Sequence, residues 1–141
     1  MNSKSSLSIL LVEDDKFYAE LIRDYLIRNG YPIVRHARNG IECLVEVFEK
    51  KAPDLVIMDQ QLGKTSGLEL LQRIRAYKPF TRVLFLSSVN QVDIATKALK
   101  YGAMDFLNKD EQVFENLVPA LNQVMEQKAR LAPIRWFSKT S

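Results

Sequence analysis

Five short apolar runs alternate along the chain with segments of helical periodicity. Most of the runs are continuous and contain β-branched residues, which is typical of strands that are covered on both faces of a sheet. They predict β-strands at Leu7–Val12, Pro32–His36, Leu55–Met58, Val83–Leu86 and Met104–Leu107.

The segments between these runs place apolar residues three or four positions apart, which predicts amphipathic helices. The first helix should end at Asn29-Gly30 and the second should span about residues 39–51. The third begins with a capping-box sequence, Ser66-Gly67-Leu68-Glu69, and the fourth stops at Gly102. Strands that alternate with helices through short connections predict a parallel sheet with right-handed crossovers. The expected fold is therefore α/β, with a doubly wound five-stranded parallel sheet of order 2-1-3-4-5, which is flavodoxin-like.

The fifth helix contains a proline, which helps to predict where it begins. If the helix starts near Asn116, Pro119 falls in its first turn and removes only a donor that has no partner there. Pro133 is expected to end the helix. These boundaries predict an N-terminal tail at 1–6, one folded domain at 7–130, and a C-terminal tail or the start of a linker at 131–141.

Composition and charge narrow the functional classes. The chain has 141 residues, of which 47% are hydrophobic, enough for one packed core. It has no run of about 18 apolar residues and no signal-peptide pattern, so neither a membrane segment nor secretion is expected. The only cysteine, Cys43, excludes an internal disulfide and a cysteine metal cluster, which fits a cytoplasmic protein. The single histidine, His36, should be a solvated residue at a strand end.

The formal charge of +3 does not indicate nucleic-acid binding, because of where it lies. Residues 123–141 carry four basic residues and one acidic residue, so the preceding 122 residues are neutral overall. A neutral body with a mildly basic tail lacks the clustered basic face that direct DNA binding requires.

Four of the five predicted strands deliver polar side chains at their carboxyl ends: Asp14 and Asp15, Asp59, Ser87, and Lys109. These strands are adjacent in the predicted order, so the side chains should converge on one patch. Carboxylates without His or Cys suit a hard cation such as Mg²⁺. A carboxylate beside the metal can attack phosphorus, and a lysine can neutralise a phosphoryl oxygen. The set predicts an aspartyl-phosphate site.

Other interpretations of the same residues are open. Taken alone, Asp14-Asp15 is a common signal for a helix N-terminus. A haloacid-dehalogenase-like phosphatase also uses an aspartate nucleophile at a strand end, but it needs a second acid two residues later, where this chain has Gln61. Flavin or nucleotide binding would require a glycine-rich loop after the first strand, which is absent. An interaction module that is never phosphorylated is a further alternative.

Four segments resemble receiver domains of two-component response regulators: "LLVEDD", "LVIMDQQLGKTSGLELL", "VLFLSS" and "GAMDFLNK". The resemblance covers residues 7 to about 126 and implies that Asp59 is the phosphoacceptor. It also implies that Asp15, Asp59 and the backbone carbonyl of Gln61 bind Mg²⁺ directly, with Asp14 acting through water. It implies that Ser87 and Lys109 contact the phosphoryl group, that Phe106 is the aromatic switch residue, and that Gln61 and Val89 flank the hydrolytic water.

The same resemblance implies the partners. A sensor histidine kinase or a histidine phosphotransfer protein would donate the phosphoryl group, and a homodimer could form through the face of helix 4, strand 5 and helix 5. The protein would be no enzyme in the ordinary sense, since it would catalyse only its own phosphorylation and autodephosphorylation. The chain departs from the family at Gly63 and Asp110, where proline is usual, and at Ser88, where alanine is usual. A trans peptide bond is therefore expected between Lys109 and Asp110.

Overall fold

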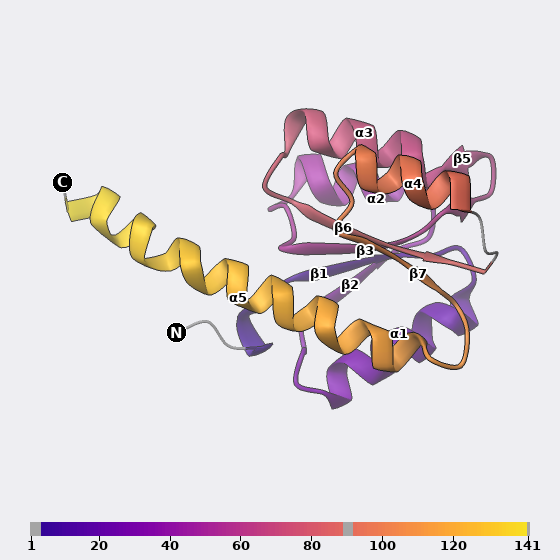
Figure 1. Cartoon of the computed structure of the whole chain (residues 1–141), viewed down its shortest axis with the longest axis horizontal. Coiled ribbons are helices and arrows are strands. Elements are labelled where there is room, and N and C mark those ends of the chain that lie inside the picture. Colours follow the sequence, from indigo (N-terminus) through magenta and orange to yellow (C-terminus); the bar gives the residue numbers. More distant parts are fainter. Residues whose placement is uncertain (1–3, 89–91, 141) are drawn as a thin grey trace.

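A computed structural model describes residues 4–88 and 92–140, with the side chains of 131–140 left out. Its main sheet has five parallel strands in the order β2-β1-β3-β6-β7 (Figure 1). In chain order this is 2-1-3-4-5, so the predicted doubly wound topology is confirmed. The strands are β1 (Ile9–Val12), β2 (Val34–Ala37), β3 (Leu55–Asp59), β6 (Arg82–Ser87) and β7 (Asp105–Asn108).

Helices cover both faces of this sheet, as the continuous apolar strands require. One face carries α1 (Lys16–Arg28) and α5 (Val113–Thr140). The other carries α2 (Gly40–Leu44), which continues into a π-helical turn, η2 (Val45–Glu49), together with α3 (Gly67–Tyr77) and α4 (Val92–Lys100) (Figure 1). A short 3₁₀ turn, η1 (Lys4–Ser6), precedes β1.

The core consists of two layers, one on each side of the sheet. Because successive strand residues point to opposite faces, Ile9 and Leu11 of β1 pack in one layer, while Leu10 and Val12 pack in the other. All four are buried. All four side chains of β1 therefore pack in the core. The first side chain after the strand that can serve another purpose is that of Glu13.

A small antiparallel hairpin follows β3, and the apolar pattern did not predict it. It consists of β4 (Gln61–Leu62) and β5 (Thr65–Ser66). Gly63 in its turn has a φ of 65°, a left-handed conformation that the fixed φ of proline cannot adopt. The departure from the family at this position therefore goes with a different local backbone.

Helix α5 differs from its predicted boundaries at both ends. It begins at Val113, because Val113 and Leu117 are both buried against the sheet and extend the apolar stripe by one turn. Pro119 consequently lies inside the helix, on its exposed side, where water can serve the carbonyl that loses its partner. The helix also passes through Pro133, whose φ is helical, and it projects beyond the sheet (Figure 1). Among the described residues, no helix combines the length and hydrophobicity that a membrane span needs.

We expect Gly67→Ala to destabilise the protein by about 1–3 kcal/mol, because there is no space for a side chain at this position. A Cβ at Gly67 would lie 2.6 Å from Cε1 of Phe85, which is fully buried, and 3.1 Å from the backbone oxygen of Asp59. Urea denaturation of the single variants and of Gly67→Ala with Phe85→Leu tests this. The double variant should lose less stability than the sum of the two single variants, because leucine has no atom at the Cε1 position. Strictly additive losses would refute the clash.

Candidate phosphoacceptor site

The carboxyl ends of the strands meet at a cleft of about 920 Å³. Its lining includes Glu13, Asp14, Asp59 and Lys109, together with residues of the β4–β5 hairpin. The sheet register explains why they meet: Val12 pairs with Met58, so Glu13 and Asp59 lie level at the ends of adjacent strands. The expected convergence of Asp14, Asp59 and Lys109 on one patch is what the structure shows.

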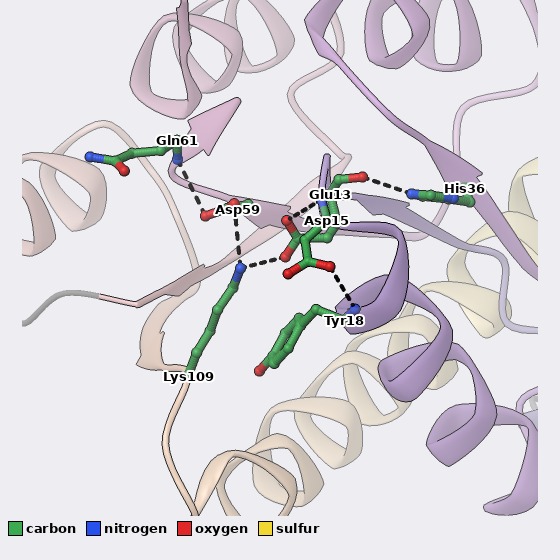
Figure 2. A network of polar contacts seen from close by, with 7 residues as sticks. All are labelled: Glu13, Asp15, Tyr18, His36, Asp59, Gln61 and Lys109. Carbon is green, nitrogen blue, oxygen red and sulfur yellow. Dashed lines mark hydrogen bonds and ion pairs between the residues drawn. The ribbon is translucent and has the colours of Figure 1, made fainter. Parts of the chain in front are cut away.

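Lys109 joins the two carboxylates of this cleft (Figure 2). Its Nζ forms an ion pair with Oε1 of Glu13 and lies 3.3 Å from Oδ2 of Asp59. All three side chains are largely buried, with exposed fractions of 2% for Glu13, 11% for Asp59 and 10% for Lys109. Four acids and two lysines line the cleft, so its formal charge is negative, and a cation would relieve the repulsion among the acids.

Glu13, Asp14 and Asp59 are the three residues whose carboxylate oxygens come together. One oxygen from each lies within 4.8 Å of the others, a spacing that suits a single hard cation. Asp15 also lines the cleft but lies outside this group. Its Oδ1 accepts a hydrogen bond from the backbone N–H of Tyr18 at 3.2 Å, which makes Asp15 the N-cap of α1. The acidic pair next to Asp59 is therefore displaced by one residue from the predicted Asp14-Asp15.

Sequence reasoning missed Glu13, although "LLVEDD" contains three acids. The signal that could have found it is the end of the apolar run: Val12 is the last core residue of β1, so Glu13 is the first residue at the strand end. Its backbone carbonyl accepts a hydrogen bond from Nε2 of His36 at 2.8 Å, and its Oε2 accepts one from the N–H of Asp15 at 3.2 Å (Figure 2). His36 is thus half-buried within β2 and anchors Glu13, contrary to the prediction of a solvated residue.

Burial and, to a smaller extent, the nearby Asp59 carboxylate together raise the pKa of Glu13 to about 7, against the opposing effect of Lys109. This gives the metal-free protein a pH dependence of predictable sign. Because the pKa in the folded state, about 7, exceeds the ordinary value of 4.5, the folded state binds more protons between these values. The stabilisation from this group is therefore fully present below pH 4.5 and is lost as the pH rises through 7.

We expect the free energy of unfolding of the wild type, minus that of Glu13→Gln, to fall with rising pH across this window when both are measured in a chelator. One titrating proton gives a slope of up to about 1.4 kcal/mol per pH unit. Subtracting the variant removes the contributions of the other carboxylates, which titrate in both proteins. A difference that is flat or that rises with pH would show that Glu13 is an ordinary acid.

Tyr18 is a second residue of the cleft that sequence reasoning did not assign to the site. Its ring centroid lies 4.4 Å from Nζ of Lys109, a cation–π contact on the side of the ammonium group away from the acids (Figure 2). Burial, followed by the charge of Glu13, raises the pKa of Tyr18 to about 12, so the phenol stays neutral at physiological pH. The ring restricts where Lys109 can move.

The remaining predicted residues lie around the cleft or beside it. Gln61 lines the cleft, and its backbone N–H donates to Oδ1 of Asp59 at 3.3 Å. Ser87 ends β6 and is buried, and it is Ser88 that lines the cleft. Phe106, in β7, is half-buried with its ring centroid 5.9 Å from that of Phe85. Val89 falls outside the described residues.

The backbone beyond β7 agrees with the sequence prediction. None of the described peptide bonds is cis, so the Lys109–Asp110 bond is trans. The backbone N–H of Lys109 donates to the carbonyl of Ser87 at 2.7 Å, which holds the lysine against the end of β6.

Comparison with known proteins gives the class. Residues 9–122 match the response regulator receiver domain. A putative transcriptional regulator of Pseudomonas aeruginosa is 38% identical over 112 residues, which are 79% of this chain and 54% of the relative, so the chain spans about half of that protein. The chemotaxis protein CheY of Bacillus subtilis is 32% identical over 117 residues, 83% of this chain and 96% of CheY.

Solved structures agree with this result. A response regulator receiver domain protein from Clostridium thermocellum has a TM-score of 0.81 at 28% identity, covering 89% of this chain and 98% of its own. A response regulator protein from Burkholderia pseudomallei, whose crystals contain a phosphorylated aspartic acid, a calcium ion and citrate, has a TM-score of 0.73 at 30% identity, covering 90% and 74%.

The chain belongs to the response regulator receiver domain family. It is a receiver domain of two-component signalling, a class that interacts with histidine kinases and binds Mg²⁺ at an acidic pocket. The haloacid-dehalogenase-like phosphatase and the unphosphorylated interaction module are not favoured by these relatives.

Proposed function

We propose that Asp59 accepts a phosphoryl group from a phosphohistidine of a sensor histidine kinase or a histidine phosphotransfer protein. The observation that carries the proposal is the position of this carboxylate. It ends β3 in the cleft, 11% exposed, with two further acids and Lys109 around it. The related Burkholderia pseudomallei structure, which contains a phosphorylated aspartic acid, supports it.

Glu13, Asp14 and Asp59 are the residues proposed to hold Mg²⁺, with the backbone carbonyl of Gln61 as a further ligand. Their donors are all oxygen atoms, and their mutual spacing fits a hard cation. This revises the expected ligand set, because Asp15 uses a carboxylate oxygen to cap α1. When bound, the metal supplies positive charge that allows a carboxylate to approach an anionic phosphoryl group.

The transfer itself requires little from the protein beyond positioning and charge. An Asp59 carboxylate oxygen forms a bond to phosphorus as the P–N bond to the donor imidazole breaks, and the electron pair leaves with the imidazole. Lys109, already 3.3 Å from Oδ2 of Asp59, can donate to the phosphoryl oxygens without a large movement. The Tyr18 ring keeps its ammonium group on the acidic side of the cleft. The ordinary enzyme classes are not proposed; the protein acts on its own Asp59.

Phosphorylation is proposed to act through Ser87 and Phe106 on the surface formed by α4, β7 and α5. That surface exposes large apolar side chains, among them Val92 at 69% and Leu99 at 50%, which suits a protein partner or a second copy of the chain. Direct nucleic-acid binding by residues 7–130 is not proposed. The proposed location is the cytoplasm, where the kinases that phosphorylate such domains act.

The test is to map the phosphate. After incubation with a phosphohistidine donor and Mg²⁺, mass spectrometry of the trapped acyl phosphate should locate one acid-labile group, on Asp59. Modification at His36, at another acid, or to the same extent in chelator would refute the proposal.

A further inference from the structure

A second cavity lies at the opposite edge of the sheet from the acidic cleft. It has a volume of about 530 Å³, within the usual range of small-molecule sites. Its lining comes from the amino-terminal ends of the strands and from α5: Arg35 of β2, Arg82 of β6 and Lys128 of α5, with Lys51 and Asp54 from the segment before β3. The receiver mechanism uses none of these residues.

The charges of this cavity are not balanced. Four basic side chains, Arg35, Lys51, Arg82 and Lys128, face one carboxylate in the lining, that of Asp54. Lys128 pairs with Asp54 at 3.0 Å, and Arg35 pairs outside the lining with Glu46 at 2.7 Å.

Lys51 and Arg82 form no close ion pair among the described residues. The side chain of Arg82 has a neutral hydrogen-bond partner instead, because its Nε donates to the amide oxygen of Gln127. Burial lowers the pKa of Arg82, and the charge of Asp54 opposes this effect. With four cations facing one carboxylate, the cavity carries an excess of positive charge, which suits a doubly charged anion.

Part of the remaining wall is apolar and comes from Ile33, Pro53 and Phe80, and Phe80 is 83% exposed. Three hydroxyl-bearing residues complete the lining: Ser6, Ser8 and Thr81. An exposed aromatic ring beside two cations suits a ligand that has a flat apolar body as well as a charge. Inorganic phosphate would satisfy only the cations.

We propose that this cavity binds a small phosphomonoester with an aromatic or heteroaromatic body, the class to which nucleoside monophosphates belong. The phosphate would lie between Lys51 and Arg82, and the flat body against Phe80. Because Gln127 and Lys128 belong to α5, the bound ligand would connect this helix to the sheet just before the helix projects beyond it.

The experiment is a titration of the whole chain with AMP and, separately, with inorganic phosphate, in chelator and at fixed ionic strength. Chelator keeps the acidic cleft, whose carboxylates repel anions, from taking up phosphate through a metal. AMP should bind saturably, with a Kd of about 1 mM or lower, and shift the NMR signals of Phe80 and Arg82. Phosphate should bind at least about tenfold more weakly.

Two variants keep the test independent of folding. Arg82→Gln removes a half-buried cation, whereas Lys51→Gln changes only an exposed side chain; each should weaken AMP binding by about tenfold. Arg38→Gln is the control, because it removes the same charge from a surface ion pair with Glu42 that lines neither cavity. The site would be refuted if AMP did not bind saturably, or if all three variants bound AMP with the same affinity. Equal affinity for phosphate and for AMP would refute the role of the aromatic body.

Discussion

Asp59→Asn is expected to reduce phosphorylation by more than about 100-fold, to the background of the assay. The carboxamide has nearly the same shape as the carboxylate but cannot form an acyl phosphate, so the loss is chemical rather than structural. The variant should fold at least as stably as the wild type in chelator, because it removes one of three crowded charges. The measurement is incorporation of labelled phosphate from a phosphohistidine protein with Mg²⁺ present.

The matched control is Asp15→Asn, which makes the same chemical change in the same cleft. Asn is as good an N-cap as Asp, so α1 should keep its cap and the labelling rate should stay within about threefold of the wild type. If Asp59→Asn is labelled as well as the wild type, the nucleophile is another residue. If Asp15→Asn loses labelling as completely as Asp59→Asn, the role of Asp15 goes beyond capping.

The second expected result concerns Mg²⁺. Because the metal relieves the repulsion among Glu13, Asp14 and Asp59, it should bind the folded protein in preference to the unfolded chain. At 100 times its dissociation constant, the metal should raise the free energy of unfolding by about 2.7 kcal/mol. Asp14→Asn should lose most of this gain, whereas Asp15→Asn should retain it.

Urea denaturation of the three proteins, each with Mg²⁺ and with chelator, decides between the two acidic pairs. The retained response in Asp15→Asn is the sharper outcome, because a ligand set of Asp15 and Asp59 would make this variant the one that loses it. The same stability measurements can be repeated with Ca²⁺, since this ion also takes oxygen ligands but tolerates a larger and less regular coordination geometry. A response lost equally in both variants would mean that the register of β1 against β3 does not select the ligands.

Residue pattern alone determined the architecture and the outline of the site. Continuous apolar strands can only be buried between two helical layers, and strands joined by helices run parallel, so their carboxyl ends must share one edge. That reasoning places Asp14, Asp59 and Lys109 together without any structure. The receiver-domain motifs then matched over most of the chain, because their residue types and spacing reflect this geometry.

Only the tertiary structure decided which acids accompany Asp59 and what lies at the other end of the sheet. The pairing of Val12 with Met58 puts Glu13 level with Asp59, and register depends on contacts between strands that are more than 40 residues apart. The early start of α5 depends on the burial of Val113, which outweighs the local preference against Pro119 inside a helix. The basic cavity joins Arg35, Lys51, Arg82 and Lys128, whose sequence separations carry no periodic signal, so folding alone brings these charges together.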